Sequence, residues 1–140
     1  MAASVSPRLD DVAVGDELPP LDVPLTRSTI VATAIASRDY TEVHHDPTIA
    51  VERGTPDIYM NILSTNGFVG RFVTDWAGPD AVLKKVAIRL GAPNHPGDTM
   101  RMTGVVSAKD EVAGTVEVSV RGANGLGDHV TGTVTLTLPS

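Results

Sequence analysis

The second half of the chain alternates apolar and polar side chains at every second position, which restricts it to extended structure. Two stretches show this period most clearly, VEVSVR at 116–121 and TVTLTL at 133–138. Because successive side chains of a strand point to opposite faces, these stretches predict half-buried antiparallel strands. Residues 82–90 and 99–108 are rich in β-branched side chains, and we expect them to join the same sheet.

The first half of the chain favours helices. Residues 27–37 carry apolar side chains at helical spacing, which predicts a short amphipathic helix. Asp46 and Pro47 are of the types that cap and begin a helix, and Gly54 is well placed to end it. Residues 58–76 are apolar on most sides, as is typical of a buried helix. Two internal glycines indicate that another backbone packs closely against this helix.

Length and composition complete the prediction of the fold class. The 140 residues suit one domain, residues 1–140. Hydrophobic residues make up 41% of the chain but aromatic residues only 4%, so the core must be mainly aliphatic. One long buried helix against a sheet of about four to six strands is an α+β arrangement.

Composition also excludes several classes of protein. The chain has no apolar run long enough for a transmembrane helix and no secretory signal pattern at its N-terminus, so we expect a cytoplasmic protein without a membrane partner. It has no cysteine, which excludes disulfides, thiolate zinc sites and cysteine nucleophiles. A net charge of −6 argues against a nucleic-acid partner, because phosphate binding favours a basic face.

The segment SRDYTEVHHDP at 37–47 contains the candidate catalytic residues. Asp39 and His44 lie five residues apart, a spacing that puts them roughly 140° apart on a helix and on opposite faces of a strand. Their side chains converge only if the chain turns between them, which the predicted helix boundaries allow. A carboxylate and an imidazole sharing one water have the groups for both proton transfers of an addition or elimination.

Two other interpretations of the same segment stay open. Asp39 could simply end a helix while the histidines lie on the surface, because short patterns of this kind often arise by chance. Alternatively, His44, His45 and Asp46 could bind a metal, although adjacent residues rarely face one point.

The segment resembles the hydratase-2 motif of MaoC-like proteins, S-x-D-x-N-P-[IL]-H-x-D, with Asp39, His44 and Asp46 in register. Three further stretches agree in order: residues 70–76 resemble the family's central helix, PGDT at 96–99 its turn, and residues 124–134 its last hairpin and strand. The resemblance runs from about residue 12 to the C-terminus. It implies a hot-dog fold, in which an antiparallel sheet of about five strands wraps around one long central helix.

Further stretches resemble the small subunit of heteromeric MaoC-like enoyl-CoA hydratases that actinobacteria use on cholesterol side chains. They are EVHHD at 42–46, IYMNIL at 58–63, TDWAGP at 74–79 and GDHVT at 127–131. This resemblance implies a hydro-lyase that acts on a steroid enoyl-CoA and needs no cofactor besides the coenzyme A of its substrate. It implies Asp39 and His44 as the catalytic pair. It also implies a second MaoC-like hot-dog subunit in a heterodimer or heterotetramer, with a homodimer as the alternative.

The chain departs from the family pattern at two places. Thr41 and Glu42 replace the Asn-Pro that follows the aspartate, so proline does not fix the loop. Met60 and Asn61 replace a His-Gly whose glycine amide binds the thioester oxygen in the family. The backbone N–H of Asn61 is expected to serve instead, because helix N-termini offer free donors. Met60 and Ile62 are therefore predicted to contact substrate as well.

Candidate contacts to the coenzyme A phosphates are Lys84 and Arg89, although a solvated strand face explains them equally well. We expect Arg71 and Asp75 to form a structural i, i+4 pair. His95 and His129 are expected to be surface residues.

In the hydration hypothesis, His44 is the general base and Asp39 the acid or water-orienting group, although these two roles could be exchanged. One alternative is a hot-dog acyl-CoA thioesterase, for which Asp57 is the nearby carboxylate. The other alternative is a non-catalytic acyl-CoA-binding subunit.

Overall fold

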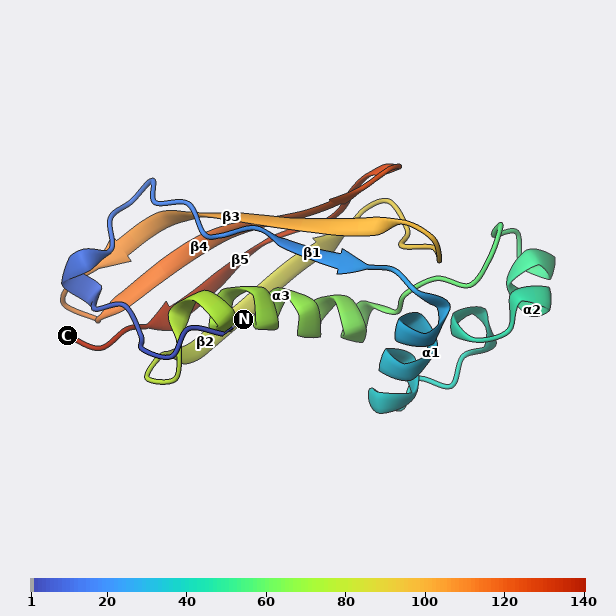
Figure 1. Ribbon diagram of the computed structural model, residues 1–140, viewed down its shortest axis with the longest axis horizontal. Helices are drawn as coiled ribbons and strands as arrows, with labels where there is room; N and C mark the ends of the chain where they lie inside the picture. The colour runs from blue at the N-terminus through green and yellow to red at the C-terminus, as the bar shows by residue number, and fades with distance from the viewer. Residues whose placement is uncertain (1) are drawn as a thin grey trace.

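A five-stranded antiparallel sheet curves over one long helix, with two short helices beyond the start of that helix (Figure 1). The computed structural model describes residues 2–140. The strands are β1 (Leu21–Pro24), β2 (Val82–Leu90), β3 (Thr99–Asp110), β4 (Thr115–Asn124) and β5 (Gly127–Thr137), in the sheet order β1-β3-β4-β5-β2. The helices are α1 (Arg27–Ala36), α2 (Pro47–Glu52) and α3 (Ile62–Ala77), with 3-10 turns at Leu9–Asp11 and Glu42–His44. This is the α+β hot-dog arrangement expected from the sequence.

The side chains of the last two strands alternate between the buried and the solvent-facing side of the sheet, as predicted. Val116, Val118 and Val120 of β4 are buried. Val134 and Leu136 of β5 are buried on the same side of the sheet and belong to the same core cluster as Val69, Phe72 and Val73 of α3. The core is therefore a layer of aliphatic side chains between the sheet and α3.

The period of two did not reveal β1, which contains only four residues. It pairs with β3 from Leu21 opposite Met102 to Pro24 opposite Thr99. A strand this short shows little alternation, and its proline argues against a central strand. Proline is tolerated because β1 lies at one edge of the sheet and has a neighbour on one side only.

The predicted start of the long helix was wrong by four residues, because Ile58–Asn61 precede α3 instead of forming its first turn. Asn61 is the N-cap, and its side chain accepts a hydrogen bond from the backbone N–H of Ser64. The backbone N–H groups of the two residues before Asn61 form hydrogen bonds with distant loops. Tyr59 N–H donates to the carbonyl of Val43, and Met60 N–H donates to that of Asn94. Their N–H groups are thus satisfied outside any helix.

Helix α3 is buried on one side and open on the other, so the prediction that it is buried all round was too broad. Val69 and Val73 are fully buried, whereas Ile62 is 52% exposed and Leu63 is 49% exposed. The prediction of a backbone packed against the helical glycines was also wrong. Gly67 faces open space, and the nearest atom to a Cβ at Gly70 would be a side-chain atom of Leu83.

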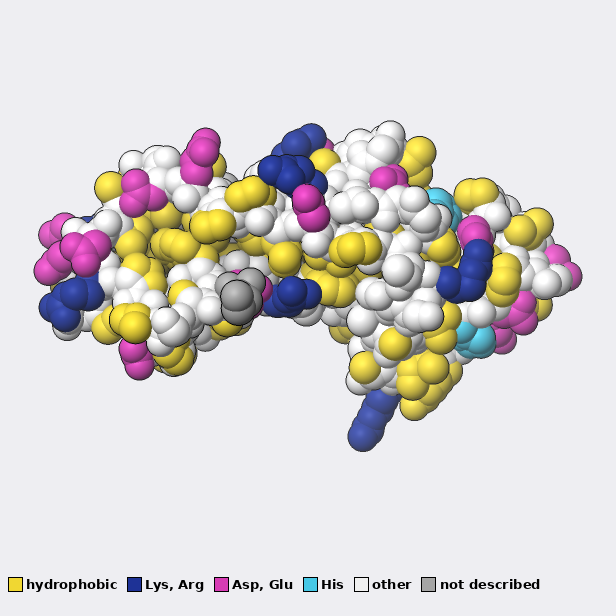
Figure 2. All heavy atoms as spheres, viewed as in Figure 1, with side chains coloured by type: hydrophobic (Ala, Val, Ile, Leu, Met, Phe, Trp, Pro, Cys, Tyr) yellow, Lys and Arg dark blue, Asp and Glu magenta, His cyan; other side chains and the backbone are white. Residues whose placement is uncertain are grey.

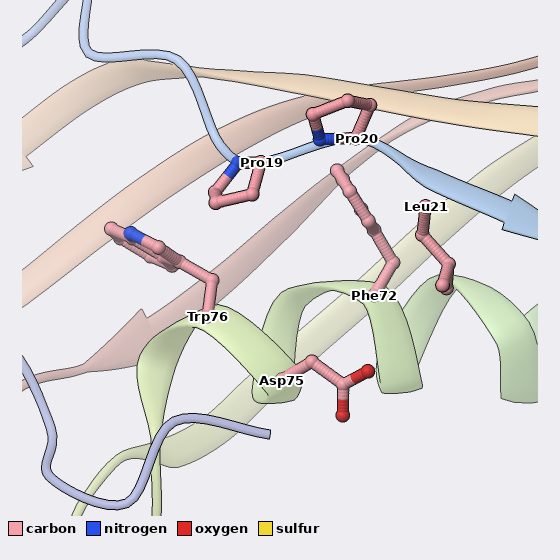
Figure 3. A pocket seen from close by; sticks show the side chains of 6 residues that line it. All are labelled: Pro19, Pro20, Leu21, Phe72, Asp75 and Trp76. Atoms are coloured by element: carbon pink, nitrogen blue, oxygen red, sulfur yellow. The ribbon is translucent and has the colours of Figure 1, made fainter. Parts of the chain in front are cut away.

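The C-terminal half of α3 packs against the segment that leads into β1. Figure 3 shows Phe72 and Trp76 pointing from α3 toward Pro19 and Pro20, with a cavity of about 100 Å³ between the segment and the helix. This packing fixes one end of α3 against the sheet. This cavity is lined by residues of the C-terminal half of α3, whereas Asp39 and His44 line a different cavity together with Ile62 at the start of that helix.

The two short helices lie beyond the start of α3, where Figure 2 shows histidine and hydrophobic side chains at the surface. Thr26 caps α1, and Asp46 caps α2 as predicted by accepting from the N–H groups of Thr48 and Ile49. Gly54, with φ of 95°, follows the end of α2 as expected. No helix in the described part of the chain combines the length and the hydropathy that a membrane crossing requires.

Gly132 is the position where the sheet tolerates a side chain least. A Cβ there would collide with the carbonyl oxygen of Ala87 and lie 3.0 Å from Cα of Ile88 on the paired strand β2. We expect Gly132→Ala to lower the free energy of unfolding by about 1–3 kcal/mol. Gly67→Ala on open helix surface is expected to raise it by about 0.5–1 kcal/mol. Urea denaturation of both variants tests this, and equal effects of the two substitutions would contradict the packing described.

Candidate active site

The chain turns sharply after α1, and this turn brings Asp39 and His44 together. Arg38 has a positive φ of 57°, and the next N–H, that of Asp39, donates back to the carbonyl of Ala34. A 3-10 turn, Glu42–His44, then returns the chain toward Asp39. Nε2 of His44 lies 3.3 Å from Oδ2 of Asp39. The loop that the spacing required is therefore present, and these side chains do not lie apart on the surface.

The imidazole of His44 is held in one orientation. Its Nδ1 lies 2.6 Å from the carbonyl oxygen of Tyr59, a group that only accepts, so Nδ1 carries the hydrogen and donates it. The ring also meets the Tyr59 ring edge to face, with centroids 5.0 Å apart. The side chain is only 10% exposed. In the neutral imidazole, Nε2 therefore carries the lone pair and points toward Asp39.

Asp39 is held as a carboxylate. Hydrogen bonding from Thr41, and next from Asn61, holds the pKa of Asp39 below its usual value. The backbone N–H of Thr41 donates to Oδ1 over 3.2 Å, and Nδ2 of Asn61 donates to Oδ2 over 3.0 Å. Since both donors favour the charged form, Asp39 is suited to accept hydrogen bonds and poorly suited to donate a proton near neutral pH.

Asp39 and His44 open onto a cavity of about 330 Å³ at the start of α3. Met60, Asn61 and Ile62, which the sequence predicts to contact substrate, also line this cavity. Its remaining walls come from Tyr59, from Leu90 at the end of β2, from Gly91 and Pro93 after that strand, and from His129 of β5. Within residues 2–140, the backbone N–H groups of Asn61 and Ile62 have no hydrogen-bond acceptor. The cavity thus combines a carboxylate–imidazole pair with free donors at a helix N-terminus.

Comparisons with known proteins show the family of this chain. The family model described as "MaoC like domain" matches residues 12–124. This chain belongs to the MaoC-like domain family.

One named relative and one solved structure, both from Mycobacterium tuberculosis, are similar to this chain. The chain is 47% identical to the 3-oxo-4,17-pregnadiene-20-carboxyl-CoA hydratase beta subunit over 125 residues, which cover 89% of this chain and 95% of that protein. It also superposes on a chain of the ChsH1-ChsH2 complex with a TM-score of 0.87 and 47% identity, covering 90% of this chain and 98% of that one.

The R-hydratase PhaJ1 of Pseudomonas aeruginosa matches with a TM-score of 0.85 at 20% identity, covering 96% of this chain and 87% of that one, which supports the fold alone. Family membership and the hydratase beta subunit from M. tuberculosis support a hydro-lyase activity for this chain.

The loop that departs from the MaoC-like motif is shaped by hydrogen bonds instead of by proline. Thr41, which stands where the family has asparagine, directs its N–H to the Asp39 carboxylate. Glu42, which stands in place of proline, makes an exposed contact of 3.3 Å with Arg53. Asp39 and His44 thus remain in contact without the proline.

The two predicted phosphate contacts lie outside the cavity of this MaoC-like chain. Lys84 and Arg89 are exposed on β2, and neither is among the residues that line the cavity. The neighbouring residue Leu90 does line it, so Arg89 is next to the cavity in sequence. Their role in binding coenzyme A therefore stays a prediction.

The prediction that His95 and His129 are surface residues was wrong. His129 is 2% exposed, with Nδ1 lying 2.6 Å from the carbonyl oxygen of Ala92 and Nε2 lying 2.8 Å from the Thr65 hydroxyl. His95 is half-buried and contacts the carbonyl oxygen of Ile58. Sequence alone gave no signal for this burial, because a histidine in a strand is compatible with either face.

Two alternatives lose support in the structure. Both oxygens of Asp57, the carboxylate that a thioesterase would need, accept hydrogen bonds of 2.8 Å from Arg27. That contact holds the pKa of Asp57 below its usual value. In the part of the chain that is described, no three His, Cys, Asp or Glu side chains gather as a metal site requires.

The predicted i, i+4 ion pair of α3 forms. The side chains of Arg71 and Asp75 lie 3.5 Å apart.

His129 is expected to make the stability of the protein depend on pH. Burial lowers the pKa of His129, so the folded chain keeps it neutral at a pH where the unfolded chain binds a proton. The unfolded state then binds more protons below about pH 6.5, and the free energy of unfolding falls as the pH drops, by at most about 1.4 kcal/mol per pH unit for this one group. Denaturation between pH 7.5 and 5.5 measures this slope.

His129→Asn removes the titrating group, so the variant is expected to be less stable but to show a shallower slope. His45→Asn, at an exposed position, serves as the matched control and should keep the wild-type slope. A His129→Asn variant with the full wild-type slope would assign the pH dependence to another group.

Proposed function

We propose that this chain is the catalytic subunit of a heteromeric enoyl-CoA hydratase that adds water to a trans-2-enoyl-CoA carrying a steroid side chain. The observation that carries the proposal is the 3.3 Å contact between Asp39 and His44 on the wall of a cavity next to free helix N–H groups. Addition of water to an unsaturated thioester requires a base for the water, a proton donor for C2 and a site for the enolate oxygen. This cavity offers a candidate for each.

In the proposed reaction, His44 moves the proton. Its neutral Nε2 removes a proton from a water that the Asp39 carboxylate also holds, while the water oxygen bonds to C3. The electron pair of the C2–C3 double bond moves toward the thioester and gives an enolate. The resulting imidazolium lies against Asp39, whose negative charge stabilises it. It then returns the proton to C2, so the enzyme ends in its starting state.

The enolate oxygen is assigned to the start of α3. Asn61 and Ile62 line the cavity, and the positive end of the α3 dipole lies at the same place. Donors fixed before the reaction stabilise charge that develops only in the transition state. Met60 and Ile62 then form the apolar walls beside the acyl group, and Lys84 and Arg89 are proposed contacts for the phosphates of coenzyme A.

The steroid substrate and the partner are inferred from relatives. The M. tuberculosis protein that is 47% identical is named a hydratase of a pregnadiene carboxyl-CoA and a beta subunit, and the matching structure is of a two-protein complex. Identity that covers 95% of that protein supports the same substrate class and a second MaoC-like subunit. Exposed Ile62 beside the cavity is consistent with a site that another chain covers.

Neither alternative activity fits the site as well. A thioesterase would need a carboxylate free to act at the thioester. Both oxygens of Asp57 instead accept hydrogen bonds from Arg27. A subunit that only binds acyl-CoA has no need for an ionised aspartate in contact with an imidazole. Release of free thiol from acyl-CoA, measured with a thiol reagent, would favour the thioesterase.

Removing either member of the pair is expected to abolish hydration without unfolding the chain. Asp39→Asn and His44→Ala should each lower kcat by roughly 10²–10⁴-fold, the range typical of general acid–base catalysis. The assay follows the loss of absorbance of the conjugated thioester, with circular dichroism as the check on folding. Arg53→Ala, which removes only an exposed contact to Glu42, is the matched control. Near-normal turnover in either pair variant would exclude the proposed mechanism.

A partner subunit is expected to be required for turnover of the bulky substrate. The chain should be assayed alone and together with a larger MaoC-like protein, on crotonyl-CoA and on a steroid enoyl-CoA. Activity on the steroid thioester only in the mixture, lost with Asp39→Asn, is the expected result. Full activity of the chain alone on crotonyl-CoA would indicate a homodimeric hydratase without steroid specificity.

A further inference from the structure

The side chain of Asn61 connects the start of α3 to the candidate catalytic aspartate. Its Oδ1 accepts hydrogen bonds from the backbone N–H of Ser64 over 3.0 Å and from the Ser64 hydroxyl. Its Nδ2 donates to Oδ2 of Asp39 over 3.0 Å and to the hydroxyl of Ser37 over 2.9 Å. Asn61 is 2% exposed, so these contacts replace hydration of the amide.

The contacts of Asn61 fix which way its amide points. The backbone N–H of Ser64 can only donate, so it must face the amide oxygen. The ionised Asp39 can only accept, so it must face the amide nitrogen. A flipped amide would break the helix cap and place an oxygen against the carboxylate at the same time. The helix cap therefore selects the orientation in which Asn61 donates to Asp39.

Oδ2 of Asp39 is the oxygen that both Asn61 and His44 approach. It lies 3.0 Å from Nδ2 of Asn61 and 3.3 Å from Nε2 of His44, while Oδ1 is bound by the N–H of Thr41. Without Asn61, the carboxylate would be restrained by the Thr41 N–H on one oxygen only and would be free to turn away from the imidazole. The hydrogen bond from Asn61 is therefore the contact that holds Oδ2 where it can accept a hydrogen bond from the imidazolium of His44.

We propose that the Asn61 side chain is a positioning residue of the hydratase, which aims the Asp39 carboxylate at His44 through a hydrogen bond anchored in the N-cap of α3. This inference rests on the proposed function and goes beyond the backbone N–H role assigned to the same residue. Asn61 acts through Asp39 and does not contact the reacting atoms with its side chain.

The charged groups around Asp39 are few, which makes a pH profile a sharp test. Within residues 2–140, His44 of the 3-10 turn is the titratable side chain in direct contact with Asp39. His129 of β5 lies on another wall of the cavity, and burial lowers its pKa. Arg38 is exposed, and Asn61, the N-cap residue of α3 that contacts Asp39, is neutral. A charge introduced at position 61 would therefore act first on Asp39 and His44.

The decisive variant is Asn61→Asp, measured in the complex that turns over crotonyl-CoA or the steroid enoyl-CoA. Aspartate caps a helix as well as asparagine does, so the start of α3 is retained. The new carboxylate replaces a donor with a like charge beside Asp39 and raises the proton affinity of both Asp39 and His44. The acid limb of the kcat/KM profile is expected to move to higher pH, and kcat at neutral pH should fall at least tenfold.

Asn61→Ser is the uncharged counterpart. Serine also caps helices, but its hydroxyl is too short to bridge Ser64 and Asp39 together. We expect kcat to fall about 10- to 100-fold, as for the loss of a hydrogen bond to a charged group, with KM for crotonyl-CoA changed less than about twofold. Thr26→Ala, which removes the corresponding cap of α1, is the control. It should lower stability but leave the acid limb of the pH profile in place.

The outcomes separate this inference from the proposed function. If Asp39→Asn is inactive while both Asn61 variants keep wild-type kcat and an unmoved acid limb, the positioning role is wrong and the hydratase assignment stands. If the Asn61 variants lose activity only in proportion to lost stability, as Thr26→Ala does, Asn61 is a helix cap and nothing more. If Asp39→Asn retains activity, the proposed function fails first.

Discussion

The site depends on the extended segment Ile58–Met60, whose backbone binds two separate parts of the chain, the 3-10 turn Glu42–His44 and the loop after β2. The N–H of Tyr59 donates to Val43 of the 3-10 turn, the N–H of Met60 donates to Asn94 of the loop after β2, and the carbonyl of Tyr59 accepts from His44. A helix over these residues would direct the same groups along its own axis. The imidazole can therefore be oriented only because α3 begins after Asn61.

Much of the fold could be predicted from the sequence because its patterns are repeated. Four strands show β-branched or alternating residues over seven or more positions. Asp46 caps the start of α2 and Gly54 follows its end, as predicted. What the sequence could not give was the start of α3. Residues 58–61 are apolar enough to continue the helical pattern, and only tertiary hydrogen bonds to Val43 and Asn94 keep them extended. Strand β1 was missed because four residues carry too little periodicity.

The candidate site was predictable in its residue types but not in its connections. The five-residue spacing of Asp39 and His44 required a turn, and the turn exists. The third partner of this pair, the Asn61 side chain, comes from 22 residues further along the chain. No local pattern predicts such a contact, and the sequence indicated only that asparagine replaces a glycine of the family. Asn61, which departs from the family motif, thus contacts both Asp39 and the first turn of α3.

The two histidines of the cavity differ in what binds their ring nitrogens. Both ring nitrogens of His129 are occupied, one by the carbonyl of Ala92 and one by the hydroxyl of Thr65, so neither is free to exchange a proton with a ligand. His44 has one nitrogen committed to Tyr59, while the other faces a carboxylate at the cavity wall. Burial lowers the pKa of His129, whereas His44 lies beside the carboxylate of Asp39. Of the two histidines, His44 is therefore the one that we propose to transfer protons in this cavity.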